Sequence, residues 1–213
     1  MNYLKSYIKE GEHQRQDFKF RVDDAKKIAR TLVAFANTDG GRLLIGVKDN
    51  GKVVGINPEE EFHMVQGAAS LYCKPVLNVF TNILEDKHKL VLEVVVEAAE
   101  NKPYMALDEN DKWKVYVRRD DHTLLANKIL LGVWKQKKKK FATPQTFDEN
   151  EQLVLSIIKE HQPLSLSKIY RKSKLKKAYV DKLLILFVSW GVIKMEITPT
   201  GTFFFVEEEK FAL

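Results

Sequence analysis

The chain has 213 residues, 45% hydrophobic and 30% charged, with a formal net charge of +6 at pH 7 and a pI near 9.2. This length suits two modest domains, the positive balance favours a polyanionic partner, and the single cysteine, Cys73, excludes an intramolecular disulfide framework. The sequence shows neither a signal peptide nor a stretch long enough to span a membrane, so we expect a cytoplasmic protein with no membrane partner.

A helix, a tight turn and a buried strand follow one another in the first fifty residues. Apolar residues recur at helical spacing over residues 25–36, and an aspartate precedes them as a cap. Gly40 and Gly41 tolerate positive φ and turn the chain into the apolar run 43–47. Asn50-Gly51 then predicts a hairpin. Its second strand would cover residues 52–56.

The same reasoning extends the first domain to residue 131. Further elements are expected in this order: a helix over 59–72, an antiparallel pair of strands over 76–84 and 88–97, a strand over 113–118 and a closing helix over 123–131. Residues 1–131 should therefore form an α+β domain, in which helices pack on a mixed sheet.

The last third of the chain has a different pattern. The lysine-rich and proline-containing segment 132–147 is typical of an exposed linker, whose charge would also suit phosphate contacts. After it, three amphipathic helices precede two strands over 192–197 and 202–206. This order predicts a small winged helix-turn-helix domain over residues 148–213.

Four motifs in the first domain form a pattern that is more specific than its element order. They read Glu12-x(4)-Asp17-Phe-Lys19, Ala34-Phe-Ala-Asn-Thr-x-Gly-Gly41, Ile45-Gly-Val-x-Asp49 and Tyr116-Val-Arg118. Together they resemble the Schlafen-like, AlbA-type DNA-binding domain family, which is common in bacterial regulators. The resemblance covers about residues 10 to 130, and Asp17 stands where the family more often has Glu.

Basic residues in the last third predict a nucleic-acid interface. Helix-turn-helix proteins place the start of the second helix of the motif in the major groove, and flanking cations hold the phosphates. Between residues 168 and 182 seven basic residues face one acid, Asp181. The predicted contacts in both domains are Lys19, Arg118, Arg119, Lys168, Arg171, Lys172, Lys174, Lys176, Lys177 and Tyr179. A solvated lysine face on a protein-docking module is the alternative.

Three acidic residues offer a catalytic alternative. The resemblance implies it, because family members that cleave transfer and ribosomal RNA use three acids, which correspond here to Glu12, Asp17 and Asp49. If these carboxylates converge, they would hold Mg²⁺ or Mn²⁺ and activate a water. Alternatively, the first two pair with neighbouring cations and Asp49 satisfies its turn. The glycines do not form a phosphate loop, which argues against ATP.

The sequence thus favours a DNA-binding transcriptional regulator that needs no cofactor for binding. Duplex DNA is the favoured partner, structured RNA is an alternative, and a homodimer is compatible with the pattern. The second hypothesis is a metal-dependent endoribonuclease acting on structured RNA, and the third is a protein-docking adaptor.

Overall fold

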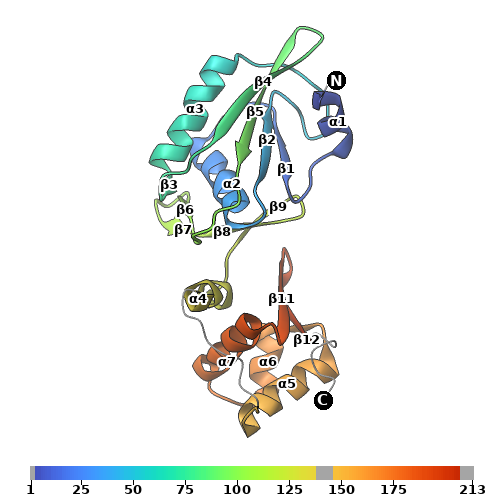
Figure 1. Ribbon diagram of the computed structural model, residues 1–213, viewed down its shortest axis with the longest axis vertical. Coiled ribbons are helices and arrows are strands. Elements are labelled where there is room, and N and C mark those ends of the chain that lie inside the picture. Colours follow the sequence, from blue (N-terminus) through green and yellow to red (C-terminus); the bar gives the residue numbers. More distant parts are fainter. Residues whose placement is uncertain (1–2, 138–145, 207–213) are drawn as a thin grey trace. The chain divides into compact units, whose positions relative to one another are not determined.

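The computed structural model describes residues 3–137 and 146–206. The chain divides into two compact units, Met1–Leu125 and Ala126–Leu213, each with its own elements (Figure 1). Both units mix helices and strands, which confirms the predicted α+β class. The division falls six residues before the predicted boundary.

The first unit contains three helices and nine strands among its described residues. In chain order they are α1 Tyr3–Glu10, β1 Gln16–Lys19, α2 Ala25–Asn37, β2 Gly41–Ile45, α3 Pro58–Leu71, β3 Cys73–Lys74, β4 Phe80–Asp86, β5 Lys89–Val96, β6 Met105–Leu107, β7 Trp113–Lys114, β8 Tyr116–Arg119 and β9 His122–Leu125.

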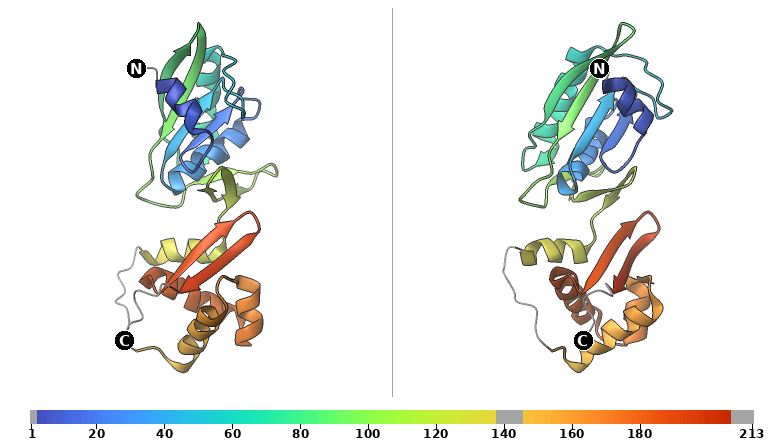
Figure 2. Two further views of the ribbon diagram at one scale, coloured as in Figure 1. Left: turned by 90° about the vertical axis from the view of Figure 1, so that its right-hand side faces the viewer. Right: turned by 45° about the vertical axis from the view of Figure 1, so that its right-hand side comes forward.

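A four-stranded mixed sheet in the order β1-β2-β5-β4 forms the centre of this unit. Strands β1 and β2 are parallel, and the other neighbours are antiparallel. Helices α2 and α3 bury one face of the sheet in the larger apolar core, whereas α1 lies against part of the other face and buries Leu4 there (Figure 2). Asp24 caps α2 by accepting hydrogen bonds from the amides of Lys26 and Lys27, as predicted.

The second unit has four helices and three strands among its described residues. They are α4 Lys128–Lys137, α5 Glu149–His161, β10 Leu164–Ser165, α6 Leu166–Ser173, α7 Lys177–Trp190, β11 Ile193–Thr198 and β12 Gly201–Val206. The three strands form one antiparallel sheet in the order β10-β12-β11. Asp148 and Glu151 form a capping box at the start of α5.

Helix α4 packs closely against α7 within the second unit. A Cβ added at Gly132 would lie 2.3 Å from a side-chain atom of Ile185, so only glycine permits this approach. Ile129 is fully buried in the same core as Phe187 and Phe204. Residues 128–137 therefore belong to the second unit rather than to a linker.

Three sequence predictions are wrong in detail. Residues 123–131 do not form one helix, because β9 pairs with β8 up to Leu125 and α4 begins at Lys128. The run 52–56 makes only an isolated bridge, between Val53 and Val47, because β5 takes the place beside β2. Of the predicted linker, 132–137 is helical and 138–145 lies outside the described residues.

Candidate nucleic-acid interface

Asp17 and Arg118 form a buried ion pair in the first unit. The Nη2 atom of Arg118 lies 3.0 Å from Oδ1 of Asp17, and the two side chains are only 2% and 6% exposed. Arg118 also donates to the carbonyl oxygens of Gln16 at 3.2 Å and Asp120 at 3.1 Å, and its guanidinium lies 5.2 Å from the ring centroid of Phe35. The predicted phosphate contact from Arg118 does not fit this placement, because the cation is enclosed by protein.

Asn37 and Thr38 fix the strand that carries Arg118. The Asn37 amide donates to the carbonyls of Tyr104 and Tyr116, each at 2.8 Å, and accepts from the Tyr104 amide at 2.8 Å. The Thr38 hydroxyl accepts from the Arg118 amide at 2.9 Å. Because buried polar groups are stable only when they are hydrogen-bonded, these motif residues connect the end of α2 to β8.

The two glycines of the motif are also structural. Gly40 has φ of +70°, and a Cβ there would lie 2.8 Å from the carbonyl oxygen of Val96. A Cβ at Gly41 would lie 2.5 Å from the ring of Phe35. The double glycine therefore lets the chain pass between α2 and β5, with no room for larger side chains.

The three acidic residues do not converge as a metal site. Glu12 accepts a hydrogen bond from the Phe18 amide at 2.9 Å, and Asp17 is neutralised by Arg118 and Lys19. Asp49 is exposed in the turn after β2. Within residues 3–137 and 146–206, no group of three or more His, Cys, Asp or Glu side chains is placed to hold a metal ion. This arrangement does not fit Mg²⁺ or Mn²⁺, because protein cations already balance the buried carboxylate.

Glu12 remains electrostatically linked to this ion pair. Burial raises the pKa of Glu12 above its ordinary value, and the nearby Asp17 carboxylate adds to the increase. The backbone hydrogen bond from Phe18 and the charge of Lys19 oppose that shift. Glu12 is therefore held beside the pair as a partly buried acid.

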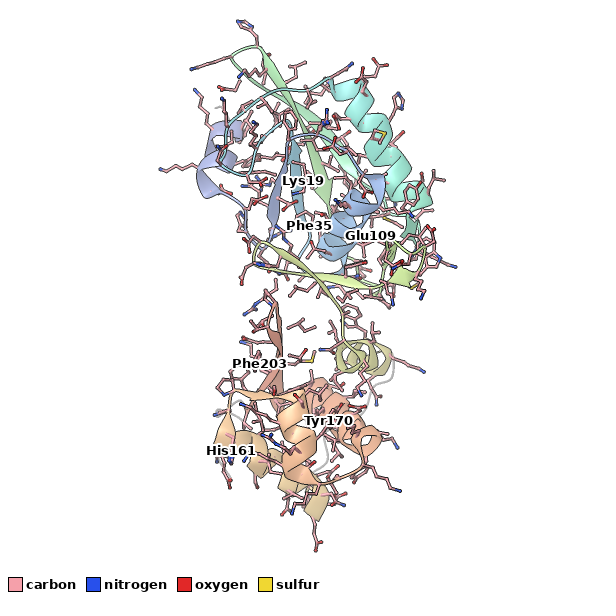
Figure 3. The ribbon with its side chains drawn as sticks, turned by 180° about the vertical axis from the view of Figure 1, so that it is seen from behind. Lys19, Phe35, Glu109, His161, Tyr170 and Phe203 are labelled. Atoms are coloured by element: carbon pink, nitrogen blue, oxygen red, sulfur yellow. The ribbon has the colours of Figure 1, made fainter. Side chains whose placement is uncertain are left out.

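The other two predicted contacts of the first unit are similarly exposed, Lys19 at 37% and Arg119 at 42%, but they differ in their partners. The ammonium of Lys19 lies 2.7 Å from Oδ2 of Asp17, off the direction of a hydrogen bond, and donates to the Phe18 carbonyl at 2.6 Å. Figure 3 labels Lys19 within the first unit. Arg119 is 42% exposed and lies 3.7 Å from the Asp120 carboxylate. Lys19 thus lies beside the buried Asp17 carboxylate, whereas the carboxylate beside Arg119, that of Asp120, is 81% exposed.

The second unit presents the predicted basic residues at its surface. The predicted cations of this unit, together with Lys182, lie on α6, on the first two turns of α7 or in the turn between them, and all are exposed: Lys168, Arg171, Lys172, Lys174, Lys176, Lys177 and Lys182. Tyr179 is only half-exposed and packs against the apolar core. We call these seven side chains the α6–α7 basic surface.

The only acid within this segment, Asp181, has its partners inside the second unit. Asp181 accepts a hydrogen bond from the hydroxyl of Tyr170, which is labelled in Figure 3, and pairs with the ammonium of Lys128 from α4. The hydrogen bond to Asp181 raises the pKa of Lys128, and burial, with the same aspartate, raises the pKa of Tyr170. Because Asp181 is neutralised within the unit, the α6–α7 basic surface keeps its full positive charge.

Helix α7 begins without the usual capping groups. Its N-cap residue, Lys176, makes no side-chain cap hydrogen bond, and its first turn contains no acid. The first amides of a helix carry partial positive charge and favour an anion. Lys176 and Lys177 at this end add to that positive potential instead of reducing it.

Two functional features were not expected from the sequence. Lys128 was placed inside a helix of the first domain, although its partner Asp181 lies in the second unit. Arg42, in β2, stacks on the Tyr7 ring with its guanidinium carbon 3.7 Å from the ring centroid. Asn127 was the sequence signal for a helix that starts at Lys128, because asparagine is a common N-cap residue. Its side chain accepts a hydrogen bond from the Leu130 amide. No local pattern indicated the second.

A known protein family matches the part of the chain that forms the first unit. The Schlafen AlbA_2 family matches residues 12–127, more than half of the chain. The chain belongs to the Schlafen AlbA_2 family. Its matched segment contains the ion pair, the double glycine and all of the central sheet. No curated protein sequence matches the chain.

Two solved structures align with part of the chain at low sequence identity. The DIP2311 protein of Corynebacterium diphtheriae aligns with a TM-score of 0.43 and 17% identity, over 72% of this chain and 38% of its own. The N-terminal domain of a RecG-related protein of Nitrosomonas europaea aligns with a TM-score of 0.40 and 19% identity, over 68% of this chain and 98% of its own. The chain thus spans well under half of the first of these relatives.

None of the helices within residues 3–137 and 146–206 has the length and apolar character needed to cross a bilayer.

Proposed function

We propose that this protein binds nucleic acid, with duplex DNA as its preferred partner, and acts as a transcriptional regulator. The observation that carries the proposal is the α6–α7 basic surface, on which seven exposed cations face solvent while Asp181 is neutralised by Lys128 and Tyr170. Membership of the AlbA_2 family is consistent with this partner.

The second unit supports a winged helix-turn-helix mode of binding. Helices α5, α6 and α7 precede the hairpin of β11 and β12, and the turn from α6 to α7 contains Lys174 and Lys176. Lys174 closes α6 in a left-handed conformation with φ of 56°, so the chain reverses sharply before α7 starts. In this mode the start of α7 enters the major groove and the lysines hold the flanking phosphates.

The chemistry of the surface predicts how the affinity responds to salt. Lysines bind phosphates as point charges and discriminate poorly between bases, so sequence specificity should be modest. Each phosphate neutralised contributes about 0.9 to the slope of log K against log salt on duplex DNA. Removal of three contacting lysines should therefore flatten the slope by about 2.7.

The test compares two variants with equal loss of charge. The first replaces Lys174, Lys176 and Lys177 by Gln on the basic surface. The control replaces Lys27, Lys52 and Lys87, which are exposed lysines of the first unit, by Gln. Fluorescence anisotropy of a labelled duplex is measured for both from low to moderate salt. The proposal requires a flatter slope and weaker binding in the first variant only, and equal slopes in the two variants would reject it.

A second experiment decides between DNA and RNA as partner. The anisotropy titration is repeated with folded transfer RNA, and cleavage is measured separately. Folded transfer RNA is added with Mn²⁺ or EDTA, and the products are separated on a denaturing gel. Salt-sensitive binding of intact duplex is the expected result. Preferential binding of the RNA, with cutting that depends on Mn²⁺, would replace the regulator by the endoribonuclease.

A further inference from the structure

A cavity of about 640 Å³ lies in the first unit on the α1 side of the central sheet. Arg42, Val95 and Glu93 form part of its wall from β2 and β5, and Tyr7 contributes from α1. Side chains alternate between the two faces along a strand. Phe18 and Leu44 point to the α1 side, so Asp17 and its paired residue Leu43 point to the opposite face. The cavity and the Asp17–Arg118 ion pair therefore lie on different faces of the sheet.

The strand register places a donor and an acceptor next to each other in this cavity. Arg42 pairs with Val95, and the next residue of β5 on the same face is Glu93. Arg42 and Glu93 are therefore diagonal neighbours on one face of the sheet, within the reach of long side chains. Asn82 of β4 donates to one oxygen of Glu93 at 3.0 Å, which fixes that carboxylate.

Arg42 has donors that the protein does not use. Its Nη1 atom is buried and has no hydrogen-bond partner among the described residues, although its guanidinium stacks on Tyr7 at 3.7 Å. A buried guanidinium nitrogen without an acceptor is costly and rare in folded proteins. Since Tyr7 holds the group in place, Arg42 is preorganised to donate to a ligand that enters the cavity.

The chemistry of the lining selects the ligand. Positive groups of Arg15 and Arg42 are balanced by the carboxylates of Asp39, Glu93 and Glu97, so a simple anion is not favoured. A neutral planar group with both acceptors and donors fits better. Guanine presents O6 and N7, which arginine recognises, and adjacent N–H donors on its Watson–Crick edge, which a carboxylate accepts.

We propose that this cavity binds an unpaired guanine of a nucleic-acid strand, with Arg42 donating to O6 or N7 and Glu93 accepting from the base N–H groups. Tyr7 positions Arg42, and the exposed Arg15 at the rim contacts the adjoining phosphate. This assignment rests on the proposed function, because the strand that supplies the base is the one that the basic surface binds.

The experiment compares DNA duplexes of equal length that are fully paired or carry one bulged deoxyguanosine or one bulged deoxyadenosine. The measured quantity is the ratio of their dissociation constants at one salt concentration. One accommodated base should make the bulged-guanosine duplex bind about tenfold tighter than the paired one. The bulged adenosine, which lacks O6 and the adjacent N–H donors, should gain less.

The variants separate the cavity from the basic surface. Glu93→Gln keeps the side-chain length, and Arg42→Gln shortens the side chain and removes the guanidinium. Both variants should abolish the guanine advantage while leaving affinity for the paired duplex unchanged. Arg21→Gln is the matched control, because Arg21 is an exposed arginine of the same unit that does not line the cavity. Circular dichroism confirms that each variant is folded. The triple lysine variant should weaken all duplexes equally and leave the ratio intact.

Four outcomes would overturn the inference. A ratio of one in the native protein would reject guanine recognition, and so would a ratio that persists in both Arg42→Gln and Glu93→Gln. In either case, binding of the paired duplex would still support the proposed function. Binding of free guanosine monophosphate that depends on Arg42, without a bulge advantage, would assign the cavity to a free nucleotide. Failure of every duplex to bind would reject both the inference and the proposed function.

Discussion

Replacement of Arg118 by Met tests whether the Asp17–Arg118 pair stabilises the first unit. Met keeps an unbranched apolar stem but removes the guanidinium, which leaves Asp17, 6% exposed, with Lys19 as its nearest cation. Breaking a buried ion pair from one side typically costs about 3–5 kcal/mol, because the remaining charge is desolvated and uncompensated. The carbonyls of Gln16 and Asp120 also lose their donor. We therefore expect a loss near the upper end of this range.

Urea denaturation followed by circular dichroism measures the free energy of unfolding, and hydrogen exchange of α2 amides assigns the change to the first unit. Arg119→Met is the matched control on the same strand, where the side chain is 42% exposed, and a loss below about 1 kcal/mol is expected there. Asp17→Asn combined with Arg118→Met should be less damaging than Arg118→Met alone, because no buried charge remains. Equal, small effects of Arg118→Met and Arg119→Met would refute the structural role of the pair.

Three further predictions concern the same unit. The raised pKa of Glu12 means that the native protein loses stability as pH rises through the window above the ordinary value of about 4.5. Glu12→Gln should therefore raise the melting temperature at neutral pH and lose this advantage as pH falls below about 4.5. An equal difference in melting temperature between the two proteins at all pH values would contradict this. Burial raises the pKa of Cys73 to about 12, so its reaction with Ellman's reagent at neutral pH should proceed only through unfolding and accelerate in denaturant; fast reaction of the folded protein would show an open site. Gly41→Ala should cost about 1–3 kcal/mol of folding free energy, since the new Cβ would meet Phe35 at 2.5 Å, and an unchanged urea midpoint would contradict this crowding.

Local sequence patterns predicted most of the secondary structure because they act over a few residues. The helical spacing of apolar residues and the Asp24 cap locate α2, and Asp148 locates α5. The antiparallel pair of β4 and β5 was also predicted, although β4 begins at Phe80 rather than at residue 76. Pro75 predicts that the strand starts at residue 76, yet residues 76–79 lie outside its hydrogen-bonded ladder.

The site could not be predicted in the same way because its contacts are distant in sequence. Asp17 and Arg118 are separated by 101 positions, and Lys128 and Asp181 by 53. No periodicity encodes such pairings, so Asp17 was interpreted as a metal ligand and Arg118 as a phosphate contact. The basic surface was easier to predict, because its residues lie on two consecutive helices and their exposure follows from amphipathic spacing.

The placement of the motif residues changes how any loss of function in this protein must be interpreted. Asn37, Thr38, Gly41, Asp17 and Arg118 all stabilise the fold through buried contacts. A variant such as Asp17→Ala could therefore abolish an activity by unfolding the first unit, even if Asp17 never touches a substrate. Evidence for chemistry at this position would require a folded variant, for which Asp17→Asn with Arg118→Met is the suitable background. Ligand recognition is better sought in side chains whose polar groups are not used by contacts within the fold. These are Arg42, whose Nη1 has no hydrogen-bond partner among the described residues, and the exposed lysines between α6 and α7.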